Sequence, residues 1–251
     1  MIRTAGAAVG DRGAATMDRI SGRYVETPAG RMHYMDEGEG EAVLFVHGTP
    51  TWSYEWRHVI RALRGGYRCV APDHLGFGYS DRPTDFAYTP EAHAAQLERF
   101  VAGLALERFT LVVHDFGGPI GLPQALWHAG RVKRLVVMNT WMWSLADDSA
   151  IRRPARLLSG ASGRWLYERA KSLLGSTAFY EAQWAARESL RGIPSLIVWG
   201  MKDRTFGPRH LERWRSVLPE ARVVEMTRSG HWPQETEPDR VIAALESFLR
   251  E

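Results

Sequence analysis

The chain has 251 residues, of which 45% are hydrophobic and 24% are charged, so it has ample material for a globular core. Its 32 lysine and arginine residues barely exceed its 29 aspartate and glutamate residues and are scattered, which argues against a nucleic-acid-binding protein. No apolar run is long enough to span a membrane, and a single cysteine excludes an internal disulfide bond and favours a cytoplasmic location.

The N-terminal segment 1–20 is expected to be a disordered leader. It is rich in alanine and glycine but carries Arg3, Asp11 and Arg12 and lacks a continuous apolar stretch, which argues against a signal peptide. Met17 is a candidate for the true start of the chain.

Strand and helix patterns then alternate along the first half of the chain. Short apolar runs predict strands, and longer periodic segments predict helices, with strands at 24–27, 32–35, 42–46, 67–72 and 109–113 and helices at 53–63 and 91–104. The strand at 42–46 ends on the tight turn His47–Pro50. Because open α/β sheets place their functional sites at the carboxyl ends of strands, we expect functional groups near this turn.

The sequence around Asp115 has the outline of a nucleophile elbow, in which a buried strand turns sharply into a helix and exposes one side chain. The apolar run 111–113 ends on His114 and Asp115, and two glycines lead into a helical pattern at 119–128. Elbows often carry serine, whereas a carboxylate can attack a saturated carbon and form an alkyl ester. The alternative is that Asp115 caps the following helix, since aspartate is a preferred N-cap residue.

An insertion interrupts the alternation in the second half of the chain. Residues 140–192 follow a strand at 134–138 and are helical and rich in aromatic side chains, so we expect them to form a cap over the elbow. Alternation then resumes, with strands at 195–199 and 222–226 and helices at 209–218 and 238–249. The prediction is one α/β core with a mostly parallel sheet, built from residues 21–139 and 193–251.

Three ionisable residues follow three different strand ends, in the order Asp115, Asp203 and His231. This is the order of nucleophile, acid and histidine in one well-known type of hydrolytic triad. Taken singly, an aspartate after a strand is often a turn former and a loop histidine often lies on the surface. Their joint occurrence predicts a catalytic site at the carboxyl edge of the sheet.

The sequence resembles an α/β-hydrolase of the group that contains the haloalkane dehalogenases and epoxide hydrolases. The resemblance is carried by residues 47–54, 72–81, 113–118, 199–203 and 230–232. It implies an eight-stranded, mostly parallel sheet flanked by helices, with a helical cap that is shorter than usual for the family.

The resemblance also implies a mechanism. Asp115 would displace halide from a small apolar haloalkane and form an ester, and His231, oriented by Asp203, would activate the water that releases the alcohol. The main-chain N–H groups of Thr49 and Phe116 are the expected oxyanion donors. No metal or organic cofactor is required, and the sequence makes no prediction of the oligomeric state.

Two departures from the family pattern concern the halide. The residue after the nucleophile is usually tryptophan, but Phe116 has no hydrogen-bond donor in its side chain. Thr49 stands where asparagine or glutamate is common. Trp141 or Trp143 would then supply the donor of a halide or substrate pocket that Phe116 lines.

Two alternatives remain open at the level of sequence. An epoxide hydrolase would use the same nucleophile with two cap tyrosines as acids, and Tyr167 and Tyr180 are available. A binding protein that has kept the hydrolase core but lost catalysis is the second alternative. The missing halide donor favours this second alternative, whereas the presence of Asp115, Asp203 and His231 opposes it.

Overall fold

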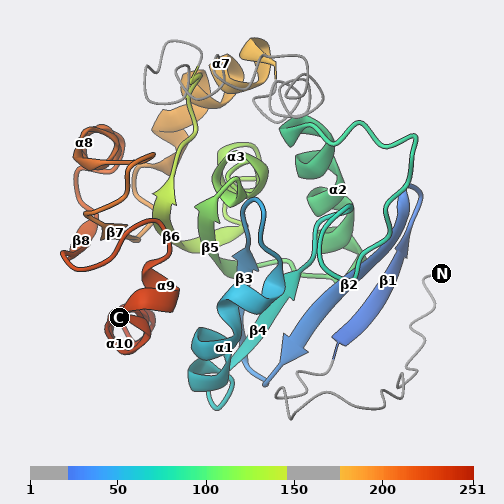
Figure 1. Cartoon of the computed structure of the whole chain (residues 1–251), viewed down its shortest axis with the longest axis horizontal. Coiled ribbons are helices and arrows are strands. Elements are labelled where there is room, and N and C mark those ends of the chain that lie inside the picture. The colour runs from blue at the N-terminus through green and yellow to red at the C-terminus, as the bar shows by residue number, and fades with distance from the viewer. Residues whose placement is uncertain (1–21, 146–175) are drawn as a thin grey trace.

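The computed structural model describes residues 22–145 and 176–251. Two predicted segments lie outside the described residues: the leader, and residues 146–175 of the cap, which include Tyr167. Eight strands in the described part of the chain form one sheet, in the order β1-β2-β4-β3-β5-β6-β7-β8 (Figure 1). The pairs β1·β2 and β2·β4 are antiparallel and the other pairs are parallel, which confirms the predicted fold class.

The strand bounds agree closely with the apolar runs of the sequence. The strands are β1 (Gly22–Thr27), β2 (Gly30–Glu37), β3 (Glu41–Val46), β4 (Tyr67–Pro72), β5 (Phe109–Asp115), β6 (Val132–Thr140), β7 (Ser195–Gly200) and β8 (Arg222–Met226). The central strand β5 is buried along its whole length. A strand covered on both faces has to be apolar throughout, which is why these runs do not alternate with polar residues.

Helices cover both faces of the sheet. They are η1 (Ser53–Trp56), α1 (Arg57–Leu63), α2 (Pro90–Gly103), α3 (Gly117–Gly121), α4 (Pro123–Leu126), α7 (Thr177–Ala185), η2 (Ala186–Leu190), α8 (Pro208–Val217), α9 (Pro233–Thr236) and α10 (Pro238–Leu249). Helices α1 and α10 lie beside one another on one face, and α2 and α3 lie together on the other (Figure 1). Within the described ranges, no helix is long and apolar enough to cross a membrane.

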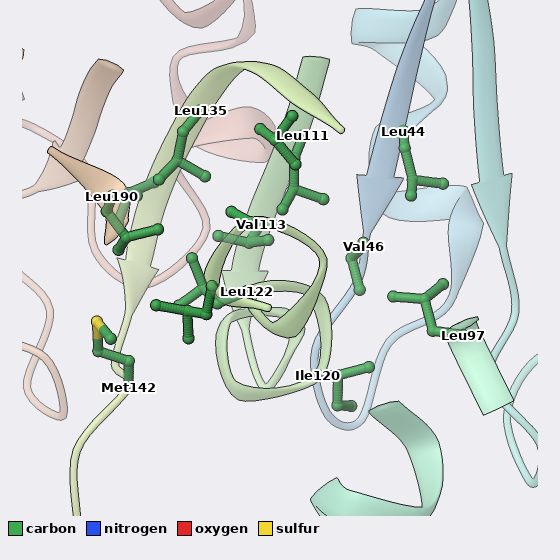
Figure 2. Close-up of a cluster of buried hydrophobic side chains, with 14 of the residues drawn as sticks. Leu44, Val46, Leu97, Leu111, Val113, Ile120, Leu122, Leu135, Met142 and Leu190 are labelled. Atoms are coloured by element: carbon green, nitrogen blue, oxygen red, sulfur yellow. The ribbon is translucent and has the colours of Figure 1, made fainter. Parts of the chain in front are cut away.

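Two hydrophobic cores follow from the alternation of side chains along each strand. In β3, Leu44 and Val46 belong to the core under α2 and α3, whereas Val43 and Phe45 belong to the core under α1 and α10. Figure 2 shows part of the first core, where Val46 lies near Leu97 of α2. The sole cysteine, Cys69, is fully buried in the second core, as its apolar surroundings in the sequence predicted.

The predicted helix at 119–128 is divided into α3 and α4. The cause is Pro123, which has no N–H to donate to the carbonyl oxygen of Pro119 one turn earlier. That oxygen instead accepts a hydrogen bond of 3.0 Å from Nε2 of Gln183, a fully buried residue of α7. A missing backbone bond in the elbow helix thus becomes the attachment point of α7, which belongs to the segment predicted to form the cap.

Candidate active site

The turn from β5 into α3 holds Asp115 in a left-handed backbone conformation, with φ at 50°. Such a conformation is costly for a residue with a Cβ and is found where the surrounding structure enforces it. A Cβ on Gly117 would collide with the carbonyl oxygen of Val46, and one on Gly118 would collide with Oγ1 of Thr140. The two glycines therefore allow α3 to approach the sheet closely enough to make the sharp turn.

The carboxylate of Asp115 is buried and is held at both oxygens. The main-chain N–H of Thr49 donates to Oδ1 at 2.8 Å, and Nε2 of His231 lies 3.1 Å from Oδ2. Burial alone would raise the pKa of Asp115, but His231, His114 and the Thr49 N–H outweigh it and lower the pKa. The residue is therefore ionised at neutral pH. The alternative of a helix cap is wrong, because the N-cap of α3 is Phe116 and no side chain caps it.

The Nδ1 atom of His231 contacts Asp203, the acid predicted from the sequence. Nδ1 of His231 donates to Oδ2 of Asp203 at 2.7 Å. The second oxygen of Asp203 accepts the main-chain N–H groups of Thr205 and Phe206 at 2.7 and 3.1 Å. These contacts lower the pKa of Asp203 although burial acts to raise it. The fold thus brings together all three residues that the sequence singled out, at the ends of β5, β7 and β8.

The imidazole of His231 lies between two carboxylates, and this governs its charge. Burial acts to lower its pKa, but the hydrogen bonds and charges of Asp115 and Asp203 outweigh burial and raise the pKa to about 10. At neutral pH the ring is therefore an imidazolium as long as Asp115 is ionised. Neutralising Asp115 would remove one of the two negative charges that keep the His231 ring protonated.

Asn139 is a residue of the candidate site that the sequence analysis did not single out. Its Nδ2 donates to Oδ2 of Asp203 at 2.9 Å, and its Oδ1 accepts the main-chain N–H of Gly200 at 2.8 Å. Asn139 therefore fixes the acid by a neutral hydrogen bond. The signal available in the sequence was a polar residue directly after the predicted strand 134–138, where functional groups of such sheets gather.

An aromatic wall adjoins the carboxylate. The ring of Phe116 meets that of Trp141 edge to face at 4.7 Å, and Trp141 stacks on Phe206 at 4.9 Å. Phe206 in turn lies 5.7 Å from the ring of His231. Trp141 is buried, and its indole N–H is a donor close to the predicted nucleophile.

Trp143 occupies a different environment from Trp141. Its ring packs against Trp184 at 6.0 Å and Trp214 at 5.6 Å, and the guanidinium of Arg213 lies 4.4 Å from its centroid. None of these partners belongs to the aromatic wall. Of the two tryptophans that the sequence proposed for the halide pocket, the contacts therefore favour Trp141.

Tyr180 of α7 brings a second polar group to this region. The residue is 2% exposed, and its hydroxyl hydrogen has no acceptor among the described residues. Burial raises the pKa of this phenol; a side-chain hydrogen bond with Trp141 acts to lower the pKa, and the carboxylates of Glu91 and Asp115 raise it further. The hydroxyl is therefore within electrostatic reach of Asp115 and close to the indole of Trp141.

Comparisons with known proteins agree with this fold. A family model described as alpha/beta hydrolase fold matches residues 41–168 and 163–238. Haloalkane dehalogenase 2 of Mycobacterium tuberculosis is 34% identical over 268 residues, which cover 89% of this chain and 93% of that protein. The solved haloalkane dehalogenase DpaA of Paraglaciecola agarilytica superposes with a TM-score of 0.80 at 25% identity, over 91% of this chain and 93% of that one.

A relative with another activity is similar over nearly the same length. The cis-3-alkyl-4-alkyloxetan-2-one decarboxylase of Shewanella oneidensis is 30% identical over 279 residues, which cover 91% of this chain and 88% of that protein. The two curated relatives thus cover most of this chain but are named for different activities.

Proposed function

The chain belongs to the α/β-hydrolase fold family, and from this premise we propose that it is a hydrolase of haloalkane dehalogenase type. Its substrate is a small apolar haloalkane and its second reactant is water. The observation that carries the proposal is the ionised Asp115 at the elbow, with the Thr49 N–H on one oxygen and His231 on the other. A carboxylate so placed is suited to displacement at a saturated carbon.

In the first step, an oxygen of Asp115 forms a bond to carbon as the carbon–halogen bond breaks, and halide leaves with the bonding electrons. The negative charge of Asp115 disappears in the ester. Because that charge helps to raise the pKa of His231, the pKa falls and the imidazolium releases its proton to solvent water. His231 thereby becomes a base only after the ester exists.

In the second step, Nε2 of His231 takes a proton from water, and the oxygen of that water attacks Cγ of Asp115. Asp203 balances the imidazolium through Nδ1. The oxyanion that forms is stabilised by the main-chain N–H of Thr49, which already contacts Oδ1, and by that of Phe116. When the oxyanion collapses, the bond from Cγ to the alkyl oxygen breaks and the leaving alkoxide takes the proton of His231. Alcohol leaves, the carboxyl proton of Asp115 passes to His231, and the ion pair of the free enzyme is regenerated.

The leaving halide needs a donor that Phe116 does not supply. We assign this role to the indole N–H of Trp141, which is buried and in contact with Phe116. The N–H would exchange its hydrogen bond with the Tyr180 oxygen for one to the halide, and a hydrogen bond to a charged acceptor is the stronger of the two. This assignment replaces the side chain that commonly follows the nucleophile in relatives.

Opening of a strained oxygen ring is the second candidate function, and Tyr180 favours it. An epoxide leaves an alkoxide attached to the substrate, which needs a proton donor rather than a halide site. The buried hydroxyl of Tyr180, whose hydrogen has no acceptor in the described part of the protein, is such a donor. The oxetanone ring of the substrate named for the relative above belongs to the same strained class.

A substrate panel separates these functions. The purified protein is incubated with 1-bromoalkanes, terminal epoxides and a β-lactone, while halide, diol and carbon dioxide are measured. We expect halide release from the bromoalkanes. Diol or carbon dioxide without halide would transfer the assignment to ring opening, and no product from any substrate would contradict both candidates.

The covalent step is tested by trapping. In His231→Phe the ester should form but not hydrolyse, because no base activates water. Mass spectrometry after exposure to a bromoalkane should therefore find one alkyl adduct on the peptide that contains Asp115. Asp115→Asn is the control and should remain unmodified. An adduct on another residue would show that Asp115 is not the nucleophile.

A further inference from the structure

A second acid–histidine pair lies behind the proposed catalytic residues and takes no part in the mechanism above. Glu55 of η1 and His114 of β5 are both buried, with side chains that are 2% and 0% exposed. Oε1 of Glu55 lies 3.3 Å from Nδ1 of His114. Burial of two ionisable groups is costly unless they are paired, so their placement here calls for a reason.

The imidazole of His114 connects this pair to the loop that bears His231. Nε2 of His114 donates to the main-chain carbonyl oxygen of His231 at 2.8 Å. A carbonyl can only accept, so the hydrogen on Nε2 is fixed by this bond. The rings of the two histidines lie 4.9 Å apart, and Nε2 of Gln234 approaches Nδ1 of His114 at 3.3 Å.

Glu55 connects the same pair to the loop that bears Thr49. The hydroxyl of Thr51 lies in hydrogen-bonding distance of both Oε2 of Glu55 and the main-chain oxygen of Gly48. The two loops that contact the Asp115 carboxylate, one through the Thr49 N–H and one through His231, therefore meet at a single buried pair.

We propose that Glu55 and His114 are a positioning pair that keeps His231 in place during hydrolysis of the ester, an inference that rests on the proposed function. In the free enzyme the charged Asp115 helps to hold His231. Once Asp115 is esterified this charge is lost, at the step in which His231 has to activate water. The bond from His114 to the His231 carbonyl does not depend on the charge of Asp115 and remains.

The kinetic test separates ester formation from ester hydrolysis by rapid quench with a bromoalkane. In Glu55→Gln, ester formation should change by less than about threefold and ester hydrolysis should slow by about tenfold or more, since a small misplacement of a catalytic group has effects of this size. Asp36→Asn is the matched control. Asp36 is a buried acid on β2 whose partners are Arg23 and Arg68, so its loss should leave the ratio of the two rates unchanged.

A second pair of variants tests the contact itself. The amide nitrogen of glutamine can reproduce Nε2 of histidine, so His114→Gln should hydrolyse the ester faster than His114→Leu. Equal rates in the two variants, or equal slowing of both steps in Glu55→Gln, would overturn the inference.

A measurement without substrate keeps this test independent of the proposed function. The Nδ1 proton of His231 is hydrogen-bonded to Asp203, and its exchange with water can be followed by NMR. Exchange should be faster in Glu55→Gln and His114→Leu than in the wild type or Asp36→Asn. Unchanged exchange contradicts the positioning role, whereas faster exchange in a protein that forms no ester contradicts only the proposed function.

Discussion

At the scale of single residues, the proposed nucleophile is well held but the side chain after it offers no donor to a leaving group. Asp115 has a main-chain N–H at Oδ1 and His231 at Oδ2, and Asp203 has four donors around its carboxylate. Phe116, which follows the nucleophile, contributes only an apolar ring that packs on Trp141. The first half of the reaction should therefore be limited by the departure of halide.

Substitution of Phe116 by tryptophan tests this limit. The indole of Phe116→Trp adds an N–H beside Asp115, and a hydrogen bond to a charged acceptor contributes about 1.5–3 kcal/mol, or about tenfold in rate at the lower end. We expect about tenfold faster ester formation with bromoalkanes, measured by rapid quench, and no gain with epoxides. Phe116→Leu is the control without a donor. A tryptophan variant no faster than the leucine variant would refute the inference that the departure of halide limits ester formation.

At the scale of elements, the elbow depends on close approach of α3 to β6. A Cβ on Gly118 would collide with Oγ1 of Thr140 and lie 2.7 Å from the main-chain oxygen of Trp141. The hydroxyl of Thr140 in turn donates to the main-chain oxygen of Asp115, so a shift of Thr140 would be transmitted to the elbow. One glycine thus links helix packing to the position of the nucleophile.

Alanine at this glycine should therefore damage both stability and activity. Overpacking against a fixed backbone costs about 1–3 kcal/mol, so we expect Gly118→Ala to lower the free energy of unfolding by about this amount. Gly65→Ala is the control, because no atom lies within 4 Å of a Cβ at Gly65. Urea unfolding measures both variants. If the two glycine variants are equally stable, the close approach is not a constraint.

At the scale of the whole molecule, buried neutral histidines set the response to acid. His93 of α2 is 3% exposed, and neither ring nitrogen has a hydrogen-bond partner among the described residues. Its ring is surrounded by aromatic rings at 5.0 to 6.1 Å, those of His74, Phe77, Phe86 and Tyr88. Burial, with a smaller contribution from His47, lowers the pKa of His93 to about 3.

This depressed pKa predicts a loss of stability in acid. The unfolded chain binds the proton near the ordinary pKa of about 6.5, so the contribution of His93 is complete above that pH and is lost as pH falls toward about 3. The slope is about 1.4 kcal/mol per pH unit. The free energy of unfolding of His93→Phe and of the wild type is measured with urea at pH 7.5, 6.0 and 5.0. Between pH 7.5 and pH 5.0 it should fall by about 2 kcal/mol less in the variant than in the wild type. Parallel curves for the two proteins would contradict this account.

Local patterns in the sequence determined the architecture. The strands at Tyr67–Pro72 and Arg222–Met226 and the helix at Pro238–Leu249 have the bounds that their apolar patterns predict. The reason is physical: a run of branched apolar residues between turn formers has few conformations other than a buried strand. The order of Asp115, Asp203 and His231 at strand ends was visible for the same reason, because parallel strands end at one edge.

Only the tertiary structure decided how that edge is supported. Asn139 binds Asp203 across 64 positions of sequence, and His114 binds the carbonyl oxygen of His231 across 117 positions. Gln183 donates to the main-chain oxygen that receives no N–H from Pro123. Such bonds depend on the order of the strands in the sheet and on the direction in which each side chain points. Neither property can be read from a short stretch of sequence. Trp141 and Trp143 are two positions apart, yet one lies at the aromatic wall beside Phe116 and the other packs on Trp184, because their neighbours come from different elements.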